Sequence, residues 1–526
     1  MEEQRTAGPA RTQRAFAVSV FVSAAWLVTV PLLGGLKWLT LVVVLGCHLR
    51  LVLLERRFPS LSQRRLLLAV AGLVVLAVVL PPYGSKDVWS YAMYGRIVGH
   101  YRASPYAHSP AAFRGDPLYL RVNNLWRHTP SVYGPLFSAA SGFGALGYRT
   151  SPLLARLYFQ ALAGLALLGS TALLLRRRVA PWIVCLIALA PATLVAVNAG
   201  HVDVLVALGI LASLLLIIDH RFALGGLALA LTLLVKIVAL PVVVGVLLAL
   251  LIARRWRPAL LLSAVLTGVV GVGYALAGGL VALSPDRHGA RYLSRASIVN
   301  GIHELYQYAH IGPWPLLRAA ATRSALALLL AAAALLIFAW RHRHSPDVAT
   351  FAVAATIIYL LTANYVLPWY ALAMLPAAAL VSERLRWYGY AVVVLLQFAY
   401  IHADRHHMPA PWLVAHIAPI PELVLLALVV FSSKPAPGSA SQRGAARQGA
   451  EPIGEATQEH SGSFAQRSLA KSTSGAELAT YPRRSKATSV ADREPRCFTA
   501  RWFGTANGSG GAPGRGGSAR RSARGR

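Results

Sequence analysis

The sequence predicts an all-α polytopic membrane protein. Of its 526 residues, 56% are hydrophobic and only 13% are charged, whereas soluble proteins carry about 25% charged residues. Apolar runs recur along the first 431 residues, and a helix needs about 20 such residues to cross a bilayer core. The runs are continuous in Leu, Ala and Val and do not alternate with polar residues, which indicates helices and excludes barrel strands.

The apolar runs divide into a series of candidate spans. They lie near 15–35, 37–54, 65–82, 152–175, 180–197, 203–218, 222–235, 241–253, 258–281, 322–340, 348–366, 369–382, 386–401 and 412–431. We therefore expect about 12 to 14 transmembrane helices. The segments 222–235 and 241–253 are short, and we expect a hairpin of half-length helices broken at Pro241.

Short arginine clusters separate the spans and predict the orientation of the chain in the membrane. When the predicted spans are counted along the chain, all of these clusters lie on the same side of the membrane. By the positive-inside rule, that side is the cytoplasm. The clusters are Arg5, Arg11 and Arg14; Arg56, Arg57, Arg64 and Arg65; Arg176 to Arg178; Arg254, Arg255 and Arg257; Arg341 and Arg343; and Arg384 and Arg386. Both termini are then cytoplasmic, and the long polar loop 83–151 lies on the outer face. The net charge of +32 follows from these clusters and the tail, so we expect no nucleic-acid partner.

Three regions follow from this pattern. Residues 1–14 form a cytoplasmic segment and 15–431 the membrane domain. Residues 432–526 are rich in Gly, Ser, Ala and Arg and cannot bury enough apolar surface to offset the entropy of ordering. We expect a disordered, basic cytoplasmic tail, which either contacts anionic lipid headgroups or is solvated without a role.

The loop 83–151 carries the first candidate for chemistry. Asp87 directly follows the third span, where a partly desolvated carboxylate can act as a general base. The alternative is a helix cap, since Asp87 could open a helix. Arg96 and Arg127 lie on the outer side against the charge trend. Their planar guanidinium groups suit a phosphate, although headgroup contacts or internal ion pairs would also explain them.

Aromatic and buried polar residues supply further candidates. Tyr91, Trp126 and Tyr133 offer rings with polar tips, suited to sugar faces or to a membrane-interface belt. His201 and Asp203 lie in a turn between two spans, where they form a polar site or Asp203 caps the next helix.

Lys236 lies inside an apolar run. A lysine buried in a membrane usually has a partner or binds an anion, and the alternative is that its side chain snorkels to the surface.

The later outer segments could complete a cleft. Their candidates are Arg291, Arg295, His303, Glu304, Trp369 and Tyr370. No GxxxxGK[ST] or GxGxxG motif indicates a nucleotide site, and no HExxH or CxxC pattern indicates zinc. The three cysteines show no disulfide framework. We expect neither a metal nor a cofactor.

Several motifs, in order, resemble one family. They are Asp87-Val-Trp-Ser-Tyr91, Asp116-Pro117, Trp126-Arg127-His-Thr-Pro130, Tyr133-Gly-Pro-Leu-Phe137, Gly200-His201-Val-Asp203, Lys236 and Pro368-Trp369-Tyr370. Over residues 15–431 the chain resembles the polyprenol-phosphate-mannose-dependent α-mannosyltransferases of actinobacteria, which belong to the GT-C superfamily of membrane glycosyltransferases. The stretch Gly99–Pro105 is longer and more basic than in that family, which leaves the acceptor and the linkage open.

The resemblance implies a fold and a reaction. The fold would be a GT-C bundle in the plasma (inner) membrane, with interfacial helices in the outer loop. Mannose would pass from polyprenyl-phosphate-mannose to a lipid-linked or cell-envelope glycan, such as a lipoglycan, with inversion. Asp87 would be the general base, and Arg96, Arg127 and Lys236 would bind the donor phosphate. The remaining candidates would bind substrate: Tyr91, Trp126, Tyr133, His201, Asp203, His303, Trp369 and Tyr370.

Two other classes of protein fit the sequence less well. A transporter or flippase of a lipid-linked glycan often has inverted repeats with matched broken helices, and the 222–253 hairpin has no convincing second copy. The polar residues also gather at the predicted outer face, which favours an enzyme. A catalytically inactive assembly partner is the third alternative, and replacement of Asp87 by Asn distinguishes it from an enzyme.

Overall fold

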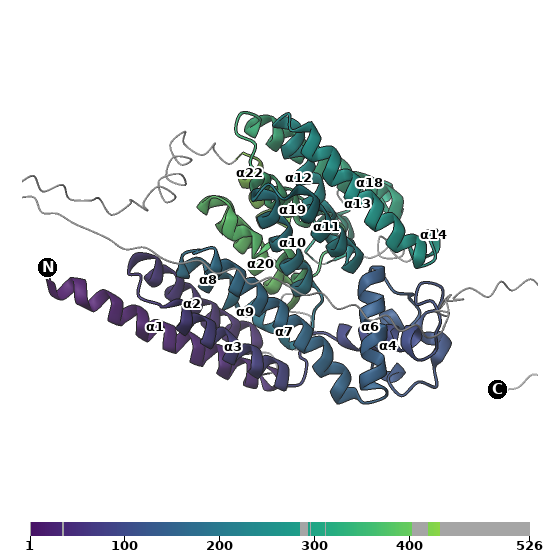
Figure 1. Ribbon diagram of the computed structural model, residues 1–526, viewed down its shortest axis with the longest axis horizontal. Coiled ribbons are helices and arrows are strands. Elements are labelled where there is room, and N and C mark those ends of the chain that lie inside the picture. The colour runs from purple at the N-terminus through teal and green to yellow at the C-terminus, as the bar shows by residue number, and fades with distance from the viewer. Residues whose placement is uncertain are drawn as a thin grey trace, which may run out of the picture. The chain divides into compact units, whose positions relative to one another are not determined.

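The computed structural model of the protein describes residues 2–33, 36–283, 293–294, 296–310, 312–401 and 419–431. Every regular element within these ranges is a helix (Figure 1). The predicted tail 432–526, the turn 402–411, Arg291 and Arg295 lie outside the described residues. The predicted all-α polytopic membrane fold is confirmed.

The first group of helices comes from the N-terminal part of the chain (Figure 1). Helix α1 (Glu2–Thr29) packs on α2 (Lys37–Arg57), and α3 (Gln63–Val79) packs on α7 (Pro152–Arg176). Helices α8 (Pro181–Ala188) and α9 (Pro191–Asn198) pack on α2 and α3. The expected span 180–197 is thus two helices, bent by 46°, because Pro191 lacks the backbone N–H that would continue α8.

The second group follows the turn at His201. It consists of α10 (Asp203–Ile218), α11 (Phe222–Val235), α12 (Leu240–Ile252), α13 (Trp256–Leu276), α18 (Ala320–His342), α19 (Val348–Thr362), α20 (Glu383–Ile401) and α22 (Pro419–Val430). Helix α11 packs between α10 and α13, and α19 packs on α12, α18 and α22. The expected span 369–382 forms two 3₁₀ helices instead, Pro368–Met374 and Ala377–Leu380. Pro368 and Pro376 remove donors that a continuous α-helix needs.

Membrane-length helices are present in both groups. Among the described residues, five segments are long and apolar enough to cross a membrane: Gly8–Leu32, Lys37–Arg57, Pro152–Arg176, Trp256–Leu276 and Ala320–His342. The bent α8–α9 pair would make a sixth, and six further apolar segments are shorter. The expected number of about 12 to 14 spans stays a prediction.

The polar loop 83–151 folds mainly around two helices, α4 (Asp87–Gly99) and α6 (Pro135–Tyr148). The short helix α5 (Asn124–Arg127) and the 3₁₀ turns Pro110–Phe113 and Tyr119–Arg121 lie between them in the chain. Glycine allows α4 and α6 to approach closely, since a Cβ atom on Gly95 would lie 2.4 Å from the Ser141 carbonyl oxygen. Helix α6 also contacts α7 and α11, which holds the loop against the helical body.

Candidate active site

A cluster of side-chain amides fixes the chain just before Asp87. Helix α3 ends at Val79 and leaves carbonyl groups without helical donors. The Asn198 Nδ2 atom donates to the carbonyls of Ala77 and Pro81, both at 3.0 Å, and its Oδ1 accepts from the Tyr83 N–H at 2.9 Å. The Gln160 Nε2 atom donates to the Asn198 carbonyl at 2.6 Å. These bonds hold the connection that delivers Asp87 to the start of α4.

Neither Asn198 nor Gln160 is among the site residues predicted from the sequence. The signal for Gln160 was nevertheless present. It is a polar amide inside the apolar run of α7, and a polar group inside a membrane segment requires partners. Arg156 gives the same signal one turn earlier, and its Nη1 donates to the Leu80 carbonyl at 2.9 Å and to Gln160 Oε1 at 3.0 Å.

Asp87 opens α4, and its side chain is 14% exposed. Its backbone N–H donates to Ser85 Oγ at 3.1 Å. Burial raises the pKa of the Asp87 carboxyl to about 6, opposed by the positive charge of Lys236 and reinforced by the negative charge of Asp203. A carboxyl with this pKa can gain and lose a proton near neutral pH, as a general base must.

His201 faces Asp87 from the turn between α9 and α10. Its Nδ1 atom lies 3.7 Å from Asp87 Oδ2, and its ring stacks on Trp369 with centroids 3.9 Å apart and planes 18° apart. Burial lowers the pKa of His201 well below its ordinary value, and the charge of Lys236 lowers it further. The imidazole is therefore neutral, and its approach to Asp87 is not an ion pair.

Lys236 has the partner that a buried lysine requires. Helix α11 ends at Val235, and Lys236 takes an extended backbone before a 3₁₀ turn, Ile237–Ala239, leads into α12. The expected break therefore lies at Lys236, and Pro241 belongs to the first turn of α12. The Lys236 Nζ atom donates to both carboxylate oxygens of Asp203, at 2.8 and 2.9 Å, and it lies 4.1 Å from the centroid of the Tyr370 ring.

The aromatic residues of the loop complete this group. Tyr91 lies one turn after Asp87, and its ring meets that of Tyr133 edge-on, with centroids 4.9 Å apart. The Gly134 N–H donates to the Val235 carbonyl at 3.0 Å, and a Cβ atom on Gly134 would lie 2.2 Å from the Leu234 carbonyl oxygen. Only glycine permits this contact, which ties Tyr133 to the end of α11 beside Lys236.

The two arginines expected at the donor phosphate are held inside the loop. Arg96 is 3% exposed; its Nε pairs with Asp116 Oδ2 at 2.5 Å, and its Nη1 donates to the Arg149 carbonyl at 2.7 Å. Arg127 donates to the carbonyls of Val122 and Leu120, at 3.1 and 2.8 Å. Neither residue contacts Asp87 or Lys236 in the described structure, so their role at a phosphate stays a prediction.

Two expected substrate residues lie apart from Asp87. Trp126 is half-buried beside Arg127 in α5. His303 lies in α16 (Ile298–Ala309), where its ring packs on Trp314 with centroids 4.0 Å apart. Its other described neighbours are Glu304 and Gln307 on the same helix, and a substrate role for His303 also stays a prediction.

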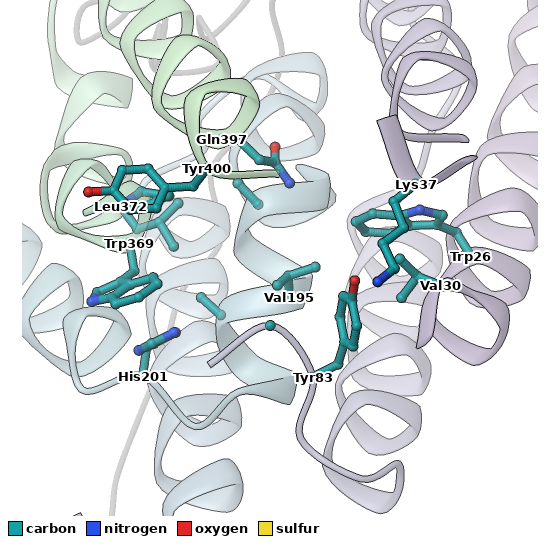
Figure 2. Close-up of a pocket in the computed structure, with 14 residues that line it drawn as sticks. Trp26, Val30, Lys37, Tyr83, Val195, His201, Trp369, Leu372, Gln397 and Tyr400 are labelled. Carbon is teal, nitrogen blue, oxygen red and sulfur yellow. The ribbon is translucent and has the colours of Figure 1, made fainter. Parts of the chain in front are cut away.

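A cavity of about 440 Å³ lies against the His201–Trp369 stack. In Figure 2, Lys37, Trp26, Val30 and Tyr83 lie on one side, and Leu372 and Tyr400 lie on the other with the stack. The walls are mainly apolar, and Lys37 supplies a positive charge near the Tyr83 ring. These wall residues were not predicted, because they come from α1 and the 3₁₀ turn after it, α2, the segment before α4, the 3₁₀ helix Pro368–Met374 and α20, which are distant in sequence.

No metal site accompanies this arrangement in the described ranges, where no group of three His, Cys, Asp or Glu side chains is placed to hold an ion. The candidate site therefore consists of Asp87, the His201–Trp369 stack, the Lys236–Asp203 pair and the ring of Tyr133, beside an apolar cavity.

Comparison with known proteins finds one family whose N-terminal domain is similar to the first part of this chain. A family model described as "Alpha-(1->6)-mannopyranosyltransferase, N-terminal domain" matches residues 6–254. That range includes Asp87, His201, Asp203 and Lys236. An alpha-(1->6)-mannopyranosyltransferase of Mycobacterium tuberculosis is 44% identical over 62 residues, which are 11% of this chain and 10% of that relative. The match thus spans about a tenth of the length of the curated relative. Over residues 6–254, just under half of its length, the chain is therefore similar to the N-terminal domain of the alpha-(1->6)-mannopyranosyltransferases.

Proposed function

We propose that the protein is an integral-membrane glycosyltransferase that transfers mannose from a polyprenyl-phosphate donor to a lipid-linked or cell-envelope glycan. One observation carries the proposal. Asp87, in the part of the chain that is similar to the mannosyltransferase family, is a largely buried carboxyl with a pKa of about 6 beside a neutral histidine. Burial of an acid is costly, and a role as a proton acceptor gives a reason for its position.

The proposed reaction uses Asp87 as the base. The acceptor hydroxyl attacks the anomeric carbon of mannose and transfers its proton to a carboxylate oxygen of Asp87. The bond from that carbon to the phosphate oxygen breaks, the electron pair leaves with polyprenyl phosphate, and the configuration inverts. His201, stacked on Trp369, would orient the groups around Asp87.

The cavity supports a lipid-linked donor. Its walls of Trp26, Val30 and Leu372 are suited to an apolar chain, and Lys37 brings a positive charge to one side. Positive charge stabilises a phosphate as it becomes a leaving group. Lys236 donates to both carboxylate oxygens of Asp203, so we propose that it stabilises the phosphate through its electrostatic field and without direct contact. Arg96 and Arg127 would first have to leave their present hydrogen-bond partners.

A second function, transport of a lipid-linked glycan, is favoured by one observation. The described part of the chain contains two helix breaks, the bent α8–α9 pair and the α11–α12 break at Lys236, and transporters often bind substrates at such breaks. Lys236 lies at one break and Ala192, just after the other, lines the cavity, so the two functions must be distinguished by measurement.

The test uses proteoliposomes with radiolabelled polyprenyl-phosphate-mannose and oligomannoside acceptors. We expect the wild type to transfer mannose and Asp87→Asn to lose transfer. Asp219→Asn is the matched control, because Asp219 ends α10 in an ion pair with Arg177 at the surface, and it should transfer normally. Movement of the donor across the bilayer without transfer would favour the transporter, and full transfer by Asp87→Asn would exclude Asp87 as the base.

A further inference from the structure

Helices α1 and α2 enclose a second cavity, of about 460 Å³. It lies at the opposite end of the helix pair from the cavity beside His201. Arg11 lines the second cavity and Trp26 the first, and the 15 residues between them on α1 correspond to roughly 22 Å of helix. The candidate active site therefore does not account for this cavity.

Residue spacing explains why arginines gather at the second cavity. On α1, Arg11, Arg14 and Val18 follow the spacing i, i+3, i+7, which places them on one helix face. On α2, Arg50 and Leu54 lie four residues apart and likewise share a face. Both faces line the cavity, so three exposed arginines from two helices border one space.

Arg11, Arg14 and Arg50 have no carboxylate partner among the residues whose side chains the structure describes. The nearby Glu55 of α2 is buried and accepts bonds from the N–H groups of Ser60 and Leu61, at 3.1 and 3.2 Å. Guanidinium groups that border one cavity repel one another, and an anion with several oxygens, above all a phosphate, relieves this repulsion.

The other wall of the cavity indicates what the phosphate is attached to. Ala15, Val18 and Leu54 contribute apolar surface, and Val18 is 49% exposed. Both helices that form the cavity are long and apolar enough to cross a membrane. We propose that this cavity binds the phosphate headgroup of an anionic lipid, with the start of an acyl chain along Val18 and Leu54.

The site is held in shape at its end. Thr12 Oγ1 donates to the Phe58 carbonyl at 3.1 Å, and Gly8 packs so closely on the Phe58 ring that a Cβ atom would lie 2.5 Å from it. These contacts hold the two helices together beside the cavity before a ligand arrives, which lowers the entropic cost of binding. A loose basic surface at a membrane edge would lack this arrangement.

Cys47 offers a direct readout, because it lines the cavity and is half-buried. Cys185 is buried, and Cys497 can be replaced by serine. The full chain is placed in nanodiscs of phosphatidylcholine with increasing phosphatidylglycerol. Two measurements are made: the rate of maleimide labelling at Cys47 and the number of anionic lipids retained in native mass spectrometry.

The test variant is Arg11→Gln/Arg14→Gln/Arg50→Gln. The matched control is Arg64→Gln/Arg65→Gln/Arg257→Gln, which removes the same charge from exposed positions that do not line the cavity. We expect phosphatidylglycerol to slow Cys47 labelling about tenfold in the wild type and the control. The test variant should need about a hundredfold more phosphatidylglycerol for the same protection, since each arginine at an anionic surface contributes several-fold in affinity.

Three results would overturn the proposal. Equal losses in both triple variants would mean that only general surface charge attracts the lipid. Protection of Cys47 by soluble glycerol phosphate as strong as that by the lipid would mean that the ligand is a free phosphate ester. If phosphatidylglycerol did not change Cys47 labelling in the wild type, the cavity would not bind the lipid. If the triple variant does not fold, Arg14→Lys retains the charge but loses the planar fork, and we expect about fivefold weaker protection.

Discussion

Replacement of Asp87 by Asn should abolish activity and yet stabilise the protein. Burial raises the pKa of the Asp87 carboxyl from 3.8 to about 6, so the folded state binds the proton more tightly than the unfolded state does. Such a group favours folding below its ordinary pKa and loses that contribution as the pH rises through about 6. From the two pKa values, ionisation of Asp87 at pH 7 costs about 3 kcal/mol of folding free energy.

Asparagine has nearly the same shape and carries no charge, so Asp87→Asn should recover up to about 3 kcal/mol at pH 7. The gain should shrink as the pH falls below about 6 and should vanish below the ordinary pKa of 3.8, where the wild-type carboxyl is protonated in both states. Loss of the base should lower mannose transfer about 10²- to 10⁴-fold. Thermal unfolding of the detergent-purified protein at several pH values measures the first effect, and transfer assays measure the second.

Asp116→Asn is the matched control for this experiment. Asp116 is also buried, but it forms an ion pair with Arg96, and breaking a buried pair costs about 3–5 kcal/mol. The two aspartate variants should therefore shift the unfolding temperature in opposite directions. A decrease in both would refute the reasoning, because it would show that the Asp87 charge is as well compensated as that of Asp116.

Three further predictions concern the same site. The kcat/KM of transfer should fall about tenfold per pH unit below the Asp87 pKa of about 6, and a profile that stays flat down to pH 4 would exclude Asp87 as the base. Lys236→Met should destabilise the protein by about 3–5 kcal/mol because it leaves Asp203 buried without its cation; thermal unfolding should show most of that loss recovered in Lys236→Met/Asp203→Asn, and no recovery would mean that the pair is not the source of the loss. Gly134→Ala should cost about 1–3 kcal/mol, because the new methyl group overlaps the Leu234 carbonyl, and unchanged unfolding would show that the α6–α11 contact is not tight.

The helices were largely predictable because a lipid environment forces the backbone to bond to itself. Helices α10 (203–218) and α11 (222–235) have the predicted bounds, since polar residues mark their ends. The bend at Pro191 and the 3₁₀ helices after Pro368 were not predicted. A proline in an apolar run can kink a helix, end it or begin the next one, and the choice depends on neighbours that the run does not reveal.

The residues of the candidate site could be predicted from the sequence, but the partner of each residue could not. Asp87, His201 and Lys236 were chosen because polar groups in apolar surroundings need a reason. Their partners follow from tertiary contacts, as the stack of His201 on Trp369 illustrates. Arg96 is a second example. The sequence left a phosphate ligand and an internal ion pair as alternatives for it, and the structure contains the ion pair with Asp116.

The amide cluster at Asn198 has a consequence for genetic studies. Asn198 joins the end of α3 to the chain before Asp87 through its contacts with Ala77, Pro81 and Tyr83. An Asn198→Ala variant would retain every acidic, basic and cationic residue of the candidate site, yet it would release the segment that positions the Asp87 carboxylate. A screen for inactive alleles would therefore recover Asn198 and Asp87 together, and only the folding free energy of each allele would separate the chemistry from its support.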